Sequence, residues 1–158
     1  MKVFLDTNII MDFCARRLPF FENASLIIDM GYRKELVLVV SSLTFINVAY
    51  ILRKAYPQDL VMQKLANLAK ICTVSPIDEE VILTGIRMKA KDFENSVQYL
   101  SALRCGAEVI ITRDAEGFKE FPIPSQTPDE FLKWFRRLYI SNDRDICPAD
   151  NLTEFSVS

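Results

Sequence analysis

Two aspartates, Asp6 and Asp114, stand just behind short apolar runs that are far apart in the chain. The runs at residues 2–5 and 108–112 have the length and composition of buried strands. Ligands of a parallel α/β sheet bind outside the carboxyl ends of its strands, so we expect the two carboxylates to meet at one sheet edge. Carboxylates that converge in this way can bind Mg²⁺ or Mn²⁺. A lone Asp after a strand is more often a helix cap or a turn former, so the pair favours a metal site only modestly.

The rest of the catalytic repertoire is narrow because the 158 residues include no histidine. This composition excludes Ser/His/Asp and Cys/His nucleophile systems and histidine-built zinc or iron sites. The four cysteines lack metal-ligand spacing, and we expect free thiols at Cys14, Cys72, Cys105 and Cys147. Any chemistry must therefore depend on carboxylates, hydroxyls, lysine or a metal ion.

The net charge of −2 gives no sign of the basic surface of a general nucleic-acid binder. If RNA is a ligand, local basic pairs must hold it. The candidates are Arg16 with Arg17, Arg33 with Lys34, Arg53 with Lys54, and Lys89 with Lys91. Each such pair is more often a solvated surface than a binding site.

Segments of strand and helix type alternate along the chain. The apolar runs predict strands at residues 2–5, 36–40, 72–74 and 108–112. Helices are expected after caps at Asn8, at Ser41 or Ser42, at Asp78 and at Asp92, and from the prolines Pro19, Pro57 and Pro128. The last of these helices opens with a capping box of Thr127 and Glu130 and should run to Leu138. This alternation predicts an α/β fold with a parallel sheet covered on both faces.

One domain is expected over residues 1–140, followed by a polar tail over residues 141–158 that lacks helical periodicity. No apolar run approaches the ~20 residues that span a bilayer. Asp6 and Asn8 lie where a signal peptide would be apolar, so a cytoplasmic location is the default expectation.

Three segments carry a resemblance to a known family: VFLDTNIIMD, VVSSLTFINVAYILRK and DFENSVQYLSALRCGAEVIITRDAEGF. In their order and separation they resemble the PIN domain family, and within it the short bacterial PIN domains similar to VapC-type toxins. The resemblance covers about residues 2–134. It implies a three-layer α/β sandwich with a central, mainly parallel sheet and a metal-dependent ribonuclease site of about four acidic residues.

The four acidic positions of the family map unevenly onto this chain. Asp6 matches the first position and Asp114 the last, whereas the second falls on Asn47 and the third on Asn95. A neutral amide oxygen can still ligate Mg²⁺ but brings no charge, so we expect weaker metal binding than in a four-carboxylate site.

A third carboxylate ligand could come from Asp92 or Glu94, which both lie beside Asn95. Helical phase favours Asp92 slightly, but Asp92 is also the expected N-cap of its helix, and the first-turn position of Glu94 equally suits a role in complementing the helix dipole. Five hydroxyl or amide side chains are candidates for orienting the ligands by hydrogen bonds, with capping or turn roles at least as plausible: Thr7, Asn8, Ser41, Thr44 and Thr112.

The resemblance therefore implies an Mg²⁺- or Mn²⁺-dependent endoribonuclease that acts on single-stranded RNA or on a structured RNA loop. It also implies an antitoxin partner and a homodimer. The alternative is a catalytically degenerate PIN-like module that binds RNA or protein, which the amides at Asn47 and Asn95 favour. A phosphotransfer domain is a weaker third reading, because the first strand ends in DTN without the second aspartate of a DxD motif.

Overall fold

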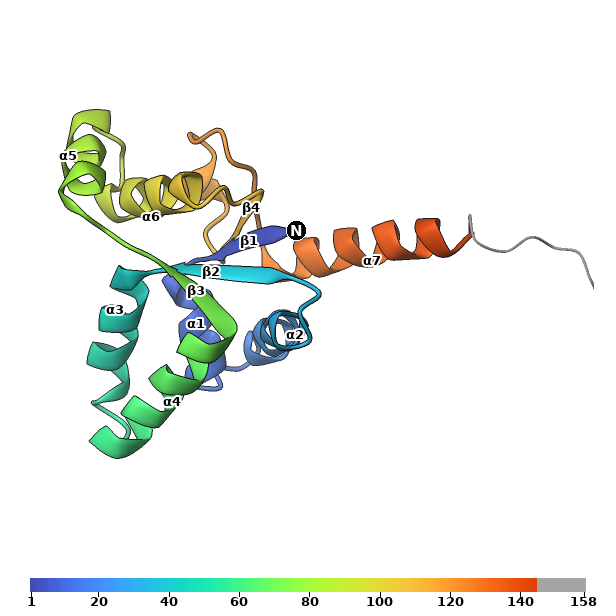
Figure 1. The fold of residues 1–158 in the computed structure, drawn as a ribbon, viewed down its shortest axis with the longest axis horizontal. Coiled ribbons are helices and arrows are strands. Elements are labelled where there is room, and N and C mark those ends of the chain that lie inside the picture. Colours follow the sequence, from blue (N-terminus) through green and yellow to red (C-terminus); the bar gives the residue numbers. More distant parts are fainter. Residues whose placement is uncertain (145–158) are drawn as a thin grey trace, which may run out of the picture.

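The computed structural model describes residues 1–144, and for residues 139–144 it describes the backbone alone. Five strands form one parallel sheet in the order β3-β2-β1-β4-β5 (Figure 1). Their bounds are β1 Lys2–Leu5, β2 Val37–Ser41, β3 Cys72–Ser75, β4 Val109–Ile111 and β5 Ser125–Gln126. Because β1 lies between β2 and β4, the chain order reverses beside β1, and this edge is where a parallel sheet binds ligands.

Helices cover both faces of the sheet, which confirms the predicted three-layer α/β fold (Figure 1). One face carries α1 Thr7–Cys14, α2 Phe21–Tyr32, α3 Ser42–Leu52 and α4 Gln58–Ile71. The other carries α5 Glu79–Met88 and α6 Phe93–Arg104. The short 3₁₀ turn η1 Glu116–Phe118 follows β4, and α7 Pro128–Arg144 packs against α2.

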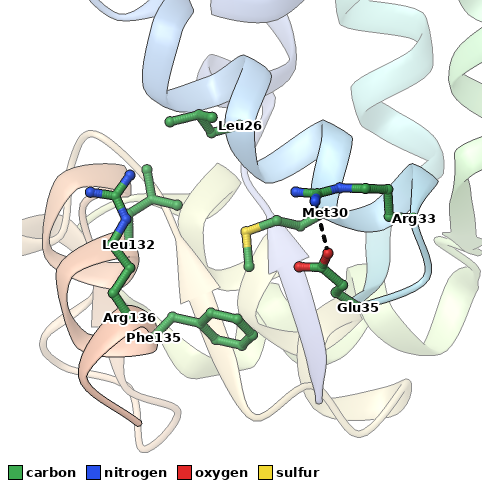
Figure 2. A pocket seen from close by; sticks show the side chains of 7 residues that line it. All are labelled: Leu26, Met30, Arg33, Glu35, Leu132, Phe135 and Arg136. Carbon is green, nitrogen blue, oxygen red and sulfur yellow. Dashed lines mark ion pairs between the residues drawn. The ribbon is translucent and has the colours of Figure 1, made fainter. Parts of the chain in front are cut away.

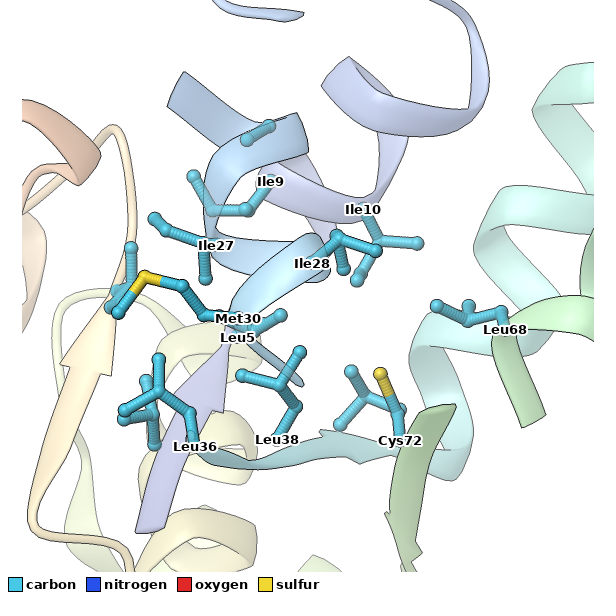
Figure 3. Packing of buried hydrophobic residues seen from close by; sticks show 14 of the residues in the cluster. Leu5, Ile9, Ile10, Ile27, Ile28, Met30, Leu36, Leu38, Leu68 and Cys72 are labelled. Carbon is cyan, nitrogen blue, oxygen red and sulfur yellow. The ribbon is translucent and has the colours of Figure 1, made fainter. Parts of the chain in front are cut away.

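Alternating residues of the central strands supply two hydrophobic cores. Val3 and Leu5 of β1 face the larger core, where α1, α2 and α4 cover the sheet (Figure 3). Phe4 faces the smaller core, beneath Tyr99 of α6 and Phe118 of η1. The central strands β1, β2 and β4 are almost entirely buried on both faces, as their continuous apolar runs predicted, whereas Thr73 and Val74 of β3 are exposed.

The predicted elements agree with the structure except at their ends. The capping box is confirmed, because Thr127 N donates to Glu130 Oε2 (2.8 Å) and Glu130 N donates to Thr127 Oγ1 (3.3 Å). The predicted cap at Asn8 is wrong, because α1 begins at Thr7 and Asp6 caps it. Ser41, the first of the two candidate caps, is the N-cap of α3.

Two differences lie near the carboxyl terminus. The two-residue strand β5 had not been predicted, and α7 continues past Leu138 to Arg144, so the first residues of the predicted tail are helical. The rest of that tail, residues 145–158, lies outside the described residues and includes Cys147. The other cysteines, Cys14, Cys72 and Cys105, are free. Within residues 1–144, no helix has both the length and the apolar character needed to cross a membrane.

Candidate functional site

Asp6 connects β1 to α1, and both oxygens of its side chain accept short hydrogen bonds. Its Oδ1 accepts from Thr7 N (2.6 Å), which makes Asp6 the N-cap of α1. Its Oδ2 accepts from Thr112 Oγ1 (2.7 Å) and from Asn8 Nδ2 (2.6 Å). The Asp6 backbone N–H also donates to Ile111 O (3.0 Å), which ties the residue to the end of β4. This carboxylate therefore has one fixed orientation.

The pKa of Asp6 is raised to about 6. Burial is the main cause, because only 7% of the residue is exposed and the charged form is poorly solvated. The hydrogen bonds from Thr112 and Thr7 oppose the rise, and the negative charges of Glu94 and Asp114 add to it. Three carboxylates thus act on one another at this edge of the sheet.

Asp114 lies in the loop after β4 and is tied to Asp6 through one hydroxyl. Thr112 Oγ1, which donates to Asp6, also accepts the Asp114 backbone N–H (3.0 Å). Gly117 N donates to Asp114 Oδ1 (3.1 Å), so the start of η1 orients this carboxylate. Asp114 itself is exposed, so it forms the open side of the site. The expectation that the two aspartates meet at one sheet edge matches this geometry.

The two amides lie in the same place as the acidic residues. Asn47 of α3 donates from Nδ2 to Glu94 Oε1 of α6 (3.4 Å), so the pair spans the opening between two helices. Asn95 donates from Nδ2 to Gly117 O (3.4 Å), beside Asp114. The structure therefore places Asn47 beside Glu94, and Asn95 beside the glycine that orients Asp114.

Asp92 and Glu94 have different surroundings. Asp92 Oδ1 accepts a hydrogen bond from Asn95 N (3.0 Å), so Asp92 is the N-cap of α6, as the sequence predicted. Asp92 precedes the helix in extended conformation, so the helical phase that favoured it as a ligand does not apply. Glu94 instead reaches Asn47 and acts on the charge of Asp6, so the geometry favours Glu94 as the third carboxylate.

A row of hydrogen-bonded polar side chains begins at Thr7, beside Asp6, and continues into the buried interior. Thr7 Oγ1 lies 3.0 Å from Thr44 Oγ1, which in turn lies 3.3 Å from Ser41 Oγ. Gln98 Nε2 donates to Thr7 Oγ1 (3.0 Å) although Gln98 is fully buried. Sequence reasoning missed Gln98. Its signal was an amide one helical turn after Glu94 and Asn95, within a segment rich in small residues.

The donor set suits a hard divalent cation. It consists of carboxylate, amide and hydroxyl oxygens, which are the ligands that Mg²⁺ and Mn²⁺ prefer. None of the ion pairs found between described residues involves Asp6, Glu94 or Asp114. A cation would offset both the burial of the Asp6 charge, which is the main cause of its raised pKa, and the smaller repulsion from Glu94 and Asp114. Among the described side chains of residues 1–138, no three His, Cys, Asp or Glu are close enough to hold a metal ion by themselves, so amides or water must complete the coordination.

A large cavity lies elsewhere. It measures about 490 Å³, opens between α2 and α7, and is lined by Leu26, Met30, Arg33, Glu35, Leu132, Phe135 and Arg136 (Figure 2). Its walls are largely apolar, and an ion pair between Arg33 and Glu35 (3.1 Å) lies at its rim. None of the acidic, amide and hydroxyl residues of the site lines this cavity, so the cavity is separate from the acidic site.

The chain is similar to known proteins in sequence pattern and in fold. A family model described as PIN domain matches residues 2–116. Curated protein sequences gave no match.

Solved structures share the fold at low sequence identity. A chain of VapBC-1 from nontypeable Haemophilus influenzae is 18% identical and has a TM-score of 0.60, covering 82% of this chain and 99% of its own. VapC20 of Mycobacterium tuberculosis, named a sarcin-ricin loop cleaving toxin, is 11% identical at a TM-score of 0.59, covering 73% of this chain and 92% of its own. A chain of VapBC2 from Rickettsia felis, bound to a promoter DNA fragment, is 16% identical at a TM-score of 0.58, covering 80% and 98%. At sequence identities this low, the similarity shows a shared fold and nothing more.

Proposed function

This chain belongs to the PIN domain family, and on that basis we propose that it is a divalent-metal-dependent endoribonuclease, the toxin of a toxin–antitoxin pair. One observation carries the proposal. A buried aspartate, Asp6, lies at the reversal of strand order, and its pKa is raised mainly by burial and to a smaller degree by the charges of Glu94 and Asp114. A charge arrangement of this kind destabilises the empty pocket and favours a bound cation.

Asp6, Asp114 and Glu94 would hold Mg²⁺ or Mn²⁺ together with amide oxygens or water, because the three carboxylates are not close enough to hold the ion by themselves. When bound, such an ion would activate water for in-line attack on phosphorus and stabilise the leaving oxygen. Residues of this chain keep the ligands in place: Thr112 and Asn8 orient Asp6, Gly117 N–H orients Asp114, and Asn47 orients Glu94. The neutral amides at Asn47 and Asn95 leave the pocket with less charge than four carboxylates would give, so metal affinity should be modest.

RNA is the proposed substrate class, on the precedent of VapC20, which is named for cleaving the sarcin-ricin loop. The local basic pairs differ in their availability. Arg33 forms ion pairs with Asp29 (3.0 Å) and Glu35 (3.1 Å), which neutralise it. Arg53 and Lys54 are exposed and lie over the Tyr50 ring, at 4.3 and 5.1 Å from its centroid. A cation beside an exposed aromatic ring is better suited to bind an RNA strand than a cation that is already neutralised by ion pairs.

Protein partners are proposed on two grounds. The VapBC structures that share this fold contain toxin with antitoxin, which motivates an antitoxin here. A second copy of the chain is proposed because large apolar side chains are exposed on α3 and α5, among them Ile46 (68%), Tyr50 (53%), Leu83 (45%) and Ile86 (58%). Size-exclusion chromatography with light scattering would decide whether the chain is a monomer or a dimer.

The experiment that tests the enzyme is RNA cleavage by the purified protein in Mn²⁺ or Mg²⁺. We expect slow cleavage that stops with EDTA and is lost in the Asp6→Asn variant, because that substitution removes the central ligand charge. Cleavage that survives Asp6→Asn would trace to a contaminating nuclease and would remove the support for the assignment.

A binding module is the second candidate function, and the amides at Asn47 and Asn95 favour it. The same assay separates the two functions when calorimetry with Mn²⁺ is added. Metal binding that depends on Asp6 without any cleavage would support the module, because the pocket would then exist without catalysis.

A further inference from the structure

Asp12 is a buried carboxylate that the proposed chemistry does not use. It lies in α1, and only 1% of its side chain is exposed. Neither of its oxygens accepts a hydrogen bond from a described residue, and its contact is an ion pair between Oδ2 and Arg113 Nε (3.0 Å). Burial raises the pKa of Asp12, while the charges of Arg113 and Arg17 lower it. Arg113 is therefore its main compensating charge.

Arg113 is held by its backbone as well as by its side chain. The guanidinium lies over the Phe20 ring, 4.3 Å from the centroid, and a third of the side chain is exposed (33%). The Arg113 backbone N–H donates to Asn8 Oδ1 (3.2 Å). Asn8 Nδ2 in turn donates to Asp6 Oδ2 (2.6 Å). Arg113 thus contacts α1 at two points, Asn8 and Asp12, which lie about one helical turn apart.

Arg113 lies in the chain between two residues of the acidic site. It stands between Thr112, which donates to Asp6, and Asp114, the exposed carboxylate of the site. Thr112 holds Asp114 by a single hydrogen bond to its backbone N–H (3.0 Å). The loop after β4 has no regular structure between Ile111 and Glu116. Hydrogen bonds hold it at Thr112 and Ala115, and the Arg113 side chain adds an anchor in α1 beside Asp114.

Stability alone does not account for the pair. A buried ion pair contributes little compared with apolar residues of similar volume, because removing both charges from water costs about as much as their attraction returns. Asp12 also lacks the hydrogen bonds that normally accompany a buried charge. We propose that the Asp12–Arg113 ion pair is a positioning device, which holds the loop so that Asp114 stays opposite Asp6. This inference rests on the proposed function, since it treats Asp114 as a ligand.

The test uses Asp12→Asn, which keeps the shape of the side chain and removes its charge. The matched control is Asp29→Asn, which breaks an exposed ion pair with Arg33 (3.0 Å) on α2. Two properties are measured in the full-length protein: hydrogen exchange of the Asp114 and Gly117 amides without metal, and Mn²⁺ affinity by calorimetry. Both amides donate hydrogen bonds that depend on the loop, to Thr112 Oγ1 and Asp114 Oδ1.

We expect Asp12→Asn to speed exchange at these two amides and to weaken Mn²⁺ binding by about tenfold or more, the usual effect of losing an outer-shell contact. Asp29→Asn should change neither. Exchange and affinity that both stay at wild-type values in a folded Asp12→Asn protein would overturn the proposal. If Asp12→Asn does not fold, the double variant Asp12→Val with Arg113→Met replaces it, with the same expected and contrary results.

The exchange measurement keeps the two proposals apart. Wild-type protein that binds no Mn²⁺ and cleaves no RNA would count against the proposed function alone. In that case faster exchange in Asp12→Asn would still establish that the ion pair positions the loop, and unchanged exchange would refute it.

Discussion

Asn95 and Asp114 meet at the backbone of Gly117. Asn95 Nδ2 donates to Gly117 O (3.4 Å), and Gly117 N donates to Asp114 Oδ1 (3.1 Å). A methyl group on Gly117 would overlap the Asp114 carboxylate and lie 2.8 Å from Asn95 Nδ2. The glycine therefore provides the space in which the two side chains come together.

Gly117→Ala should disrupt the metal site while leaving the fold intact. The added methyl meets the mobile ends of two side chains rather than the backbone, so Asp114 moves and the domain stays folded. We expect Mn²⁺ affinity to fall by about tenfold or more and the melting temperature to change little.

Gly106→Ala is the matched control for this prediction. Gly106 has a φ of +68°, and open space surrounds the added methyl. Alanine there should cost about 1 kcal/mol of stability and leave Mn²⁺ affinity unchanged. Equal effects of the two alanines on affinity would contradict the role given to Gly117.

Restoring charge at the amides should have opposite effects with and without metal. In the Asn47→Glu, Asn95→Asp variant, new carboxylates would repel Glu94 and Asp114, so the metal-free protein should melt at a lower temperature. Mn²⁺ should bind more tightly and stabilise the variant more than wild type, by about 1.4 kcal/mol for each tenfold gain in affinity. A thermal melt series with and without Mn²⁺ measures both. Identical melting of variant and wild type in both conditions would mean that these side chains face away from the ion.

Glu94→Gln and Asp92→Asn distinguish the two candidates for the third carboxylate. Glu94→Gln removes a charge that acts on Asp6, so Mn²⁺ affinity should fall. Asp92→Asn preserves the cap of α6, because Asn caps helices about as well as Asp, and it should leave affinity unchanged. Calorimetry on both proteins decides, and the reverse pattern would assign the ligand to Asp92.

The stability of the metal-free protein should fall as pH rises from about 4 to 6. The pKa of Asp6 is about 6 in the folded protein against an ordinary value of 3.8, so between these values the folded protein binds more protons than the unfolded chain. The contribution of Asp6 to the free energy of unfolding therefore decreases by up to about 3 kcal/mol over this range.

Urea unfolding in EDTA at several pH values tests this sign. The fall should be smaller in Asp6→Asn, where no carboxyl group titrates at that position, and it should shrink in wild type when Mn²⁺ neutralises the pocket. Parallel curves for wild type and Asp6→Asn would place the titration in other groups.

Most of the fold could be predicted because its strands are apolar on both faces and its helices carry local caps. The β-branched run before Ser41 and the capping box at Thr127 were sufficient to define their elements. The cap at Asp6 was missed because two polar residues compete there, and a backbone bond to Ile111 in another strand decides between them. The strand β5 was missed because two residues carry no periodicity and depend on β4 for pairing.

Only part of the site could be predicted from the sequence, because contacts between distant elements determine the rest. Asp6 and Asp114 could be found because each follows its own strand. The choice between Asp92 and Glu94 could not be made, because it depends on Asn47 approaching from another helix. The ion pair of Arg113 with Asp12 was not predicted, because only the fold brings these two distant residues together.

During synthesis on the ribosome, β1 emerges long before β4, because the chain leaves the tunnel amino terminus first. Val3 pairs with Val109 and Leu5 with Ile111, so one side of β1 has no neighbour until those residues have been made. Asp114 is added later still, after every other carboxylate of the site. The full set of acidic groups therefore exists only after β4 and the loop that follows it have been translated.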